Sequence, residues 1–268
     1  MELFDAHDAA AHVRVPGEHD DKYSRGVLGA ITGSDQYPGA AVLSVEAALR
    51  TGVGMVRYLG PQRASDLVLA RRPEAVAGTG RVQAWLIGSG TDHASFSDPL
   101  AEEALAQGLP VVLDGGALEL HRRRRGPLVI TPHYRELGRV LGVAPDEIAA
   151  DPEAWAQRTA ERLQATVLLK GHTTYVAGPD IQLRVKSAPT WLATAGAGDA
   201  LAGILGALVA THSAEIQTDD GMLARLAATA AVIHGRAANR ASGGGPVTIL
   251  DVCEAIPATI AELLTRLR

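Results

Sequence analysis

The feature that most constrains the fold of this chain is a series of short apolar runs without polar alternation, each leading into a loop or a helical pattern. Strands of this kind are typical of a parallel sheet that is buried on both faces. The runs cover residues 27–31, 55–59, 84–87, 110–113, 128–130 and 167–169. The sequence therefore predicts an α/β fold of three layers, with a mostly parallel central sheet and helices on both faces.

Helical periodicity fills most of the segments between and after these runs. Gly52 is expected to end the first helix, because glycine readily takes the left-handed conformation of a helix C-terminus. A hairpin, unlike the parallel strands, is predicted around Gly178-Pro179-Asp180, between residues 174–177 and 182–185. The predicted helices cover residues 40–51, 62–70, 97–107, 136–141, 152–164, 219–241 and 250–267, and a further helix begins near Gly198.

The sequence shows no internal repeat and no linker, so we expect one domain over residues 1–268, with residues 1–21 as an N-terminal arm. The formal net charge is −5, which gives no general attraction to nucleic acid. The single cysteine, Cys253, excludes an internal disulfide framework and is typical of a reducing compartment. No apolar run reaches the roughly 18 residues of a membrane span, and residues 1–21 lack the layout of a signal peptide. We therefore expect a cytoplasmic protein without membrane or nucleic-acid partners.

Residues that could bind a ligand or take part in catalysis follow the predicted strands at their carboxyl ends. Because these ends share one edge of a parallel sheet, and open α/β sheets bind ligands there, we expect a ligand site at this edge. Lys170 ends a buried strand, where its charge needs a partner, and a phosphate or a structural carboxylate would each serve. The residues at this edge are Gly33, Gly88-Ser89-Gly90, Asp114, Thr131-Pro132-His133 and Lys170-Gly171.

A turn of small residues runs into an apolar helix over residues 193–203. Its glycines allow a ligand to approach the backbone closely. The first amides of a helix lack internal partners and carry partial positive charge, so they can hold a phosphate. Asp199 lies beside these amides, which places a carboxylate next to a phosphate cradle. The same residues also fit a tight turn in which an Asp caps a core helix.

Several stretches occur in the order found in one enzyme family. With them the chain resembles the ADP/ATP-dependent NAD(P)H-hydrate dehydratases, which have a ribokinase-like fold. The Gly-x-Gly-Asp pattern is shared by the whole ribokinase-like superfamily, whereas the first and third stretches indicate the dehydratase branch. The stretches are Lys22-Tyr23-Ser24-Arg25-Gly26, Gly33-Ser34, Tyr37-Pro38-Gly39-Ala40-Ala41, Ala47-Ala48-Leu49-Arg50-Thr51-Gly52, Thr131-Pro132-His133 with Glu136, Lys170-Gly171 with Thr174, residues 194–203, and His234-Gly235.

The resemblance implies a role for each matching residue. Asp199 would be the catalytic base and would contact the substrate. The hydrated dinucleotide would also contact Ala40, Gly90 and His133, although a lone histidine is more often structural. The adenine nucleotide would bind a second set, namely Lys170, Gly171, His172, Thr173, Thr174 and Gly198. The transferring phosphoryl group would be stabilised by the amides of Ala195, Gly196, Ala197 and Gly198.

The resemblance further implies Mg²⁺ as a cofactor and ADP or ATP as co-substrate. Glu136 would hold the ion through water, although a glutamate early in a helix is also favoured by the helix dipole. The implied reaction is a hydro-lyase step that dehydrates the S-epimer of hydrated NADH or NADPH, by phosphoryl transfer to the ring hydroxyl and loss of phosphate. Family members are often homotetramers, and a separate epimerase protein would act in the same pathway.

Two other functions fit the same residues. A ribokinase-like kinase would phosphorylate a vitamin-precursor alcohol of the hydroxyethylthiazole or hydroxymethylpyrimidine type and would leave a stable phosphorylated product. A non-catalytic nucleotide sensor would need the phosphate cradle but no base, so Asp199 argues against it.

The chain departs from the family pattern in two loops. Gly88-Ser89-Gly90 stands where the family usually has Gly-Pro-Gly, and Asp114-Gly115-Gly116 stands where it tends to have Asp-Ala-Asp. If the second Asp helps to bind substrate or metal, that contribution is missing here. The basic run Arg122-Arg123-Arg124-Arg125 fits a solvated loop, or a contact to the dinucleotide of a neighbouring subunit.

Overall fold

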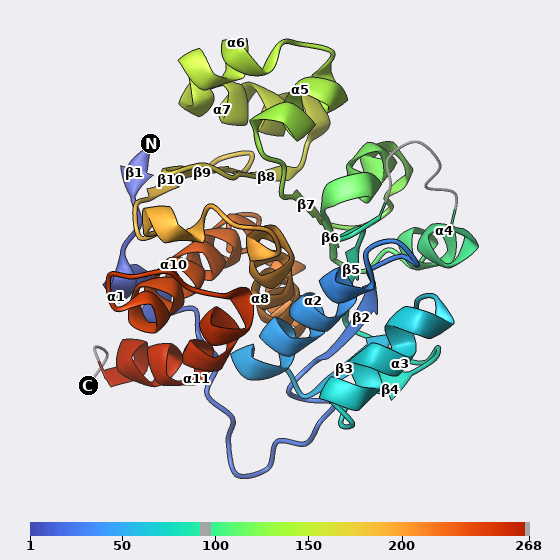
Figure 1. The fold of residues 1–268 in the computed structure, drawn as a ribbon. Coiled ribbons are helices and arrows are strands. Elements are labelled where there is room, and N and C mark those ends of the chain that lie inside the picture. Colours follow the sequence, from blue (N-terminus) through green and yellow to red (C-terminus); the bar gives the residue numbers. More distant parts are fainter. Residues whose placement is uncertain (92–97, 266–268) are drawn as a thin grey trace.

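A ten-stranded sheet with helices on both faces forms the centre of the computed structural model, which describes residues 1–91 and 98–265 (Figure 1). The strand order is β1-β10-β9-β8-β7-β6-β5-β2-β3-β4. Neighbouring strands run parallel except at β9, which is antiparallel to both β8 and β10. The strands are β1 Glu2–Leu3, β2 Val27–Ile31, β3 Met55–Tyr58, β4 Val76–Ala77, β5 Ala84–Ile87, β6 Val111–Leu113, β7 Leu128–Ile130, β8 Thr166–Leu169, β9 Thr174–Ala177 and β10 Gln182–Val185.

The helices divide between the two faces of the sheet (Figure 1). One face carries α1 Ala6–Ala10, α2 Pro38–Thr51, α3 Gln62–Arg71, α8 Ala197–Thr211, α10 Met222–Ser242 and α11 Ile249–Thr265. The other face carries α4 Pro99–Ala106, the 3₁₀ helix η1 Gly115–Arg123, α5 Tyr134–Leu141, α6 Pro145–Ala150 and α7 Pro152–Leu163. Two short helices, η2 Thr190–Leu192 and α9 Ser213–Ile216, flank α8 in the sequence.

Strand β2 shows why the sheet needs helices on both sides. All five of its residues are buried. Leu28 and Ala30 belong to the core on the α8 side, whereas Val27 and Ile31 belong to the core on the η1 side. Successive side chains of a strand point to opposite faces, so an unbroken apolar run requires cover on both. The predicted three-layer α/β fold is therefore confirmed.

Helix α8 is the most completely buried helix near the centre of the sheet. Each of its residues from Ala200 to Ala210 is buried. It packs closely on α2, and a Cβ at Gly203 would lie only 2.2 Å from the carbonyl oxygen of Ser44. The small residues of α8 thus allow two helix backbones to come together directly beneath the site-forming loops.

The described residues correct several sequence predictions. The expected N-terminal arm is wrong for residues 2–10, because β1 pairs with β10 and Phe4, Ala9 and Ala10 are buried. The predicted helix at 136–141 begins earlier, at Tyr134, and the helix predicted from residue 219 begins at Met222. The helix predicted over 97–107 spans Pro99–Ala106, and its first predicted residue lies outside the described residues. The final predicted helix is Ile249–Thr265, and residues 266–267 also lie outside them.

The remaining strand and helix predictions agree with the structure to within two residues at each end. Gly52 ends α2 in the left-handed conformation, at φ 103°, as predicted. In the ranges 1–91 and 98–265, no helix is long and apolar enough to cross a membrane.

Candidate active site at the carboxyl edge of the sheet

The strand order reverses between β2 and β5, and their loops meet at this point. The chain passes from β2 to β3 on one side, and β5 then pairs with β2 on the other. The amide of Gly33, after β2, donates a hydrogen bond to the carbonyl of Ser89, after β5, at 2.7 Å. Such a reversal leaves a crevice outside the carboxyl ends of the strands, which is where open α/β sheets bind ligands.

Ala40 and Gly90 come together at this reversal, from the start of α2 and the loop after β5. Gly90 has φ +70°, and a Cβ there would lie 2.2 Å from the Cβ of Ala40. Any larger residue at position 90 would therefore collide with α2 as well as strain the backbone. The structure thus brings these two predicted substrate contacts side by side, and both must be small.

The turn before α8 has the geometry of a phosphate cradle. Gly196 is the N-cap at φ 89°, and within the described chain no side chain caps this helix. Asp199 lies in its first turn without acting as the cap, so the alternative of an Asp-capped core helix does not describe the structure. Ala195 is exposed, and Gly196, Ala197 and Gly198 are partly exposed. The first amides of α8 are therefore available to an anion at the sheet edge.

The Asp199 carboxyl has a strongly perturbed acidity. Burial raises its pKa to about 7, the neighbouring Asp114 and Glu136 carboxylates act in the same direction, and Lys170 opposes them. A carboxyl group with a pKa near neutrality exchanges protons readily at physiological pH, which is the property that a general base needs.

Lys170 connects Asp199 to two other carboxylates. Its Nζ lies 2.8 Å from Oδ1 of Asp114 and 3.6 Å from Oε2 of Glu136. Burial disfavours the ammonium charge, but the attraction of Asp114 and Glu136 prevails and raises the pKa of Lys170. A Cβ at Gly198 would lie 3.3 Å from the Lys170 Nζ, so the ammonium sits directly beside the first turn of α8. Of the two partners that the sequence allowed, a structural carboxylate is present.

Asp114 is the residue of this cluster that the sequence placed at the edge without giving it a role. It follows β6 and is almost fully buried. Its carboxylate accepts hydrogen bonds from Ser89 Oγ at 2.9 Å and Thr131 Oγ1 at 2.7 Å. Burial opposes its ionisation, but Lys170 and these hydroxyl groups lower its pKa. The available signal was its position, since it ends a strand at the same edge as Ser89, Thr131 and Lys170.

His133 and Glu136 form a capping box at the start of α5. The Glu136 amide donates to Nδ1 of His133 at 3.1 Å, and the His133 amide donates to Oε2 of Glu136 at 2.8 Å. This box is why α5 begins at Tyr134, two residues before the prediction. Burial lowers the pKa of His133, although its side chain is half exposed. Both residues therefore have a structural role that leaves the outer side of the imidazole open at the sheet edge.

The loop after β8 places its small and polar residues at the same edge. Gly171 and His172 are exposed, and Thr173 and Thr174 are partly exposed. A Cβ at Gly171 would lie 2.8 Å from the Tyr134 hydroxyl, so glycine is needed for the loop to pass α5. The predicted nucleotide-binding residues thus extend outward from Lys170 along one continuous surface.

These side chains do not form a metal cage. Within the part of the chain that the structure describes, no three His, Cys, Asp or Glu side chains gather in a way that could hold an ion. Glu136 is engaged by the His133 amide and Lys170, and Asp114 by Ser89, Thr131 and Lys170.

Comparisons with known sequences agree with this geometry. A family model described as NAD(P)H-hydrate dehydratase matches residues 28–257. The ADP-dependent (S)-NAD(P)H-hydrate dehydratase of Neisseria meningitidis is 35% identical over 213 residues, which cover 72% of each chain. The bifunctional NAD(P)H-hydrate repair enzyme Nnr of Mycobacterium tuberculosis is 42% identical over 221 residues, which cover 78% of this chain and 46% of that protein. The chain thus spans about half the length of the bifunctional relatives that it matches.

Solved structures show the same fold. The ADP/ATP-dependent NAD(P)H-hydrate dehydratase from Bacillus subtilis, co-crystallised with ATP and Mg²⁺, matches with a TM-score of 0.88 at 24% identity, over 98% of each chain. A ribokinase-like superfamily protein from Enterococcus faecalis matches with a TM-score of 0.84 at 22% identity, over 98% of this chain and 96% of that one. The predicted ribokinase-like fold is confirmed by these matches.

Proposed function

The chain belongs to the NAD(P)H-hydrate dehydratase family, and from this premise we propose that it restores NADH and NADPH from the S-epimers of their hydrates, driven by ADP or ATP. The observation that carries the proposal is Asp199, a carboxyl group with a pKa of about 7 in the first turn of α8, beside an uncapped phosphate cradle. A base next to a phosphate site is what phosphoryl transfer to a hydroxyl group requires.

The chemistry explains why a dehydratase consumes a nucleotide. Hydroxide is a poor leaving group, so the terminal phosphoryl group of ADP or ATP is first transferred to the oxygen of the ring hydroxyl. That oxygen loses its proton to Asp199, and the bond between the transferred phosphorus and the nucleotide breaks. The lone pair of the ring nitrogen then expels phosphate from the carbon. Loss of a proton from the adjacent ring carbon restores the dihydronicotinamide.

We assign Lys170 and the turn before α8 to the phosphates of the nucleotide. The ammonium lies beside Gly198, at the positive end of the helix. Asp114 and Glu136 hold it in place and keep it charged. The amides of Ala195, Gly196, Ala197 and Gly198 would then stabilise charge on the transferring group. Gly171, His172, Thr173 and Thr174 would contact the rest of the nucleotide.

Mg²⁺ fits this site as an ion bound chiefly by phosphates and water. It would neutralise charge on the nucleotide. Glu136 would reach it through water, with its remaining lone pairs. A structural neighbour from Bacillus subtilis was co-crystallised with ATP and Mg²⁺, which supports this assignment.

We assign the hydrated dinucleotide to the reversal between β2 and β5. Ala40 and Gly90 would allow the hydrated ring to approach the backbone, because neither projects a bulky side chain. His133, half exposed and anchored by Glu136, would border the same surface. We further propose that the protein is cytoplasmic and that it assembles as a homo-oligomer, by family resemblance a tetramer. We also propose that a separate epimerase protein acts on the same substrate.

A direct assay tests the proposal. Purified protein is mixed with the S-epimer of hydrated NADH, Mg²⁺ and either ADP or ATP, and the dihydronicotinamide absorbance is followed. Recovery that depends on a nucleotide supports the proposal and identifies the phosphoryl donor. If the absorbance recovers with neither ADP nor ATP, the proposal is refuted. A stable phosphorylated product from hydroxyethylthiazole or hydroxymethylpyrimidine would favour the kinase instead.

A further inference from the structure

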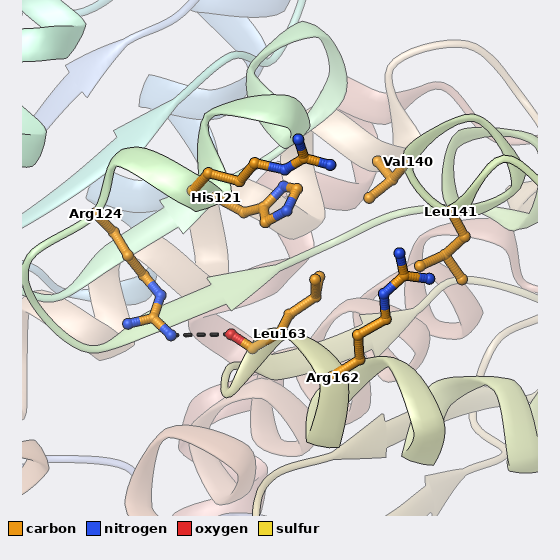
Figure 2. A pocket seen from close by; sticks show the side chains of 7 residues that line it. His121, Arg124, Val140, Leu141, Arg162 and Leu163 are labelled. Atoms are coloured by element: carbon orange, nitrogen blue, oxygen red, sulfur yellow. Dashed lines mark hydrogen bonds between the residues drawn. The ribbon is translucent and has the colours of Figure 1, made fainter.

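A pocket lies at the opposite edge of the sheet from the candidate active site. It has a volume of about 450 Å³ and opens between the end of η1, the end of α5 and the end of α7 (Figure 2). Arg124 precedes the first residue of β7, and Leu163 precedes the first residue of β8. The pocket is therefore at the amino ends of these strands, whereas Thr131 and Lys170 follow their carboxyl ends.

The charge of this pocket is positive and only partly compensated. Arg122, Arg124 and Arg162 line it. Arg124 donates from Nη2 to the carbonyl oxygens of Leu163, at 3.0 Å, and Gln164. Within residues 1–91 and 98–265, neither Arg122 nor Arg162 has a carboxylate within ion-pair distance, although other arginines nearby do. Two guanidinium groups thus converge on a pocket without an acidic partner from the described residues.

Two arginines near the pocket, by contrast, do have carboxylate partners. Arg123 forms an ion pair with Glu102, and Arg139 lies 3.6 Å from Glu119. The basic run is largely exposed, as a solvated segment would be. Within it, Arg123 is paired, Arg124 is bound to carbonyl groups, Arg122 lines the pocket and Arg125 lies outside it. The chain as a whole has a formal net charge of −5, so this pocket is a local exception.

His121 contributes an imidazole to the lining. Its Nδ1 lies 3.0 Å from the carbonyl oxygen of Leu118. Burial lowers the pKa of this imidazole, and the charges of Arg122 and Arg124 act in the same direction. The hydrogen bond to Leu118 opposes them, but the net shift is downward. The remaining lining is apolar and comes from Val140, Leu141 and Leu163.

We propose that this pocket binds a small molecule that carries a phosphate group on a compact apolar body. The planar guanidinium fork matches phosphate oxygens in two-point hydrogen bonds, and Arg122 and Arg162, both exposed, are accessible to such a group. The accessible lining is mostly polar, and the aliphatic side chains of Val140, Leu141 and Leu163 would contact the body of the ligand over the smaller, apolar part. The volume is within the range of about 300–1,000 Å³ that small-molecule sites occupy.

This site is separate from the candidate active site but is connected to it by three elements. Strand β7 runs from the pocket to Thr131, and β8 runs from the pocket to Lys170. Helix α5 has the His133–Glu136 capping box at one end and Val140 and Leu141 at the other. The proposal does not depend on the proposed reaction, because none of its lining residues belongs to the catalytic edge.

Calorimetric titration with phenyl phosphate tests the proposal. The titration uses the full chain in the presence of Mg²⁺ and saturating ADP, so that a nucleotide site at the other edge is already filled. We expect the wild-type protein to bind one phenyl phosphate per chain, and inorganic phosphate more weakly because it lacks the apolar body. The double variant Arg122→Gln/Arg162→Gln should bind at least about tenfold more weakly. Arg125→Gln, which removes the same kind of charge outside the pocket, should bind within about twofold of the wild type.

Other results would overturn the proposal. Equal binding by the wild type and the double variant would place the phosphate elsewhere, and no binding by the wild type up to about 10 mM would exclude a useful site. A change of oligomeric state in the double variant, seen by sedimentation velocity, would make the pocket a contact between copies of the chain. If circular dichroism shows that the double variant is unfolded, Arg162→Glu at the exposed surface of α7 replaces it, with the same expected loss.

Discussion

Asp199→Asn should make the folded protein more resistant to heat at alkaline pH while removing its proposed catalytic base. The carboxyl group has an ordinary pKa of 3.8 and a pKa of about 7 in the folded chain. A group whose pKa is raised on folding stabilises the protein fully below pH 3.8, and this contribution is lost as the pH rises to 7 and above. The ionised carboxylate is therefore a cost to the native state at pH 8, and asparagine cannot ionise.

The size of the effect follows from the difference between the two pKa values. At 1.36 kcal/mol for each pKa unit, full ionisation costs about 4 kcal/mol. Asp199 is partly exposed, so solvent screening reduces this to about 2 kcal/mol. The change falls between the two pKa values, from pH 3.8 to about pH 7, and somewhat more than half of it lies above pH 5. Between pH 5 and pH 8 the melting temperature of the variant should therefore rise relative to the wild type by about 3 °C.

Thermal unfolding of both proteins from pH 5 to pH 9, followed by intrinsic fluorescence, measures this difference. Asp180→Asn is the matched control, because it removes one carboxylate from an exposed hairpin turn. Its melting temperature should follow the wild type at every pH. If the gap between Asp199→Asn and the wild type is the same at pH 5 and pH 8, the burial and carboxylate repulsion that we assign to Asp199 are not acting on it.

Three further substitutions probe the same network and its support. Lys170→Met removes the ammonium that keeps the pKa of Asp199 from rising further. The acidic limb of the pH profile of kcat/KM should therefore move to higher pH. If the limb does not move, another group is the base. Asp114→Asn leaves Lys170 with one carboxylate partner. The free energy of unfolding, measured by urea titration, should fall by about 3 kcal/mol. A loss below about 0.5 kcal/mol would show that the Asp114–Lys170 pair is not structurally important. Gly203→Ala would place a Cβ 2.2 Å from the Ser44 carbonyl oxygen, so it should lower the free energy of unfolding by about 1–3 kcal/mol, whereas Gly39→Ala, with open space around it, should be tolerated.

The parallel sheet could be predicted from sequence because its signal is local. Residues 27–31, 84–87 and 128–130 are apolar without alternation, and each forms the strand that this pattern indicates. Strand β1 carries no such signal. It has two residues, and its partner β10 lies about 180 positions away in the sequence, so only the assembled sheet edge defines it.

In the candidate site too, some residues could be found from a local sequence pattern, whereas others depend on partners that are distant in the sequence. Asp199 was found because it follows glycines at the start of a strongly apolar helix, which is a pattern within a few neighbouring positions. The partner of Lys170 was left open between a phosphate and a carboxylate, because Asp114 is 56 positions away and nothing local links the two. The capping role of His133 and Glu136 depends on backbone direction at one turn, which their spacing allowed but did not specify.

The placement of Asp199 on the most buried helix also has an evolutionary consequence. Substitutions along α8 disturb the core, since its residues from Ala200 to Ala210 are all buried. The loop after β2 reaches the surface, where Asp35, Gln36 and Tyr37 are exposed. Substitutions in this loop should therefore be tolerated more readily than substitutions in α8. The surface proposed to meet the substrate could then change while the helix that carries the proposed base keeps its packing.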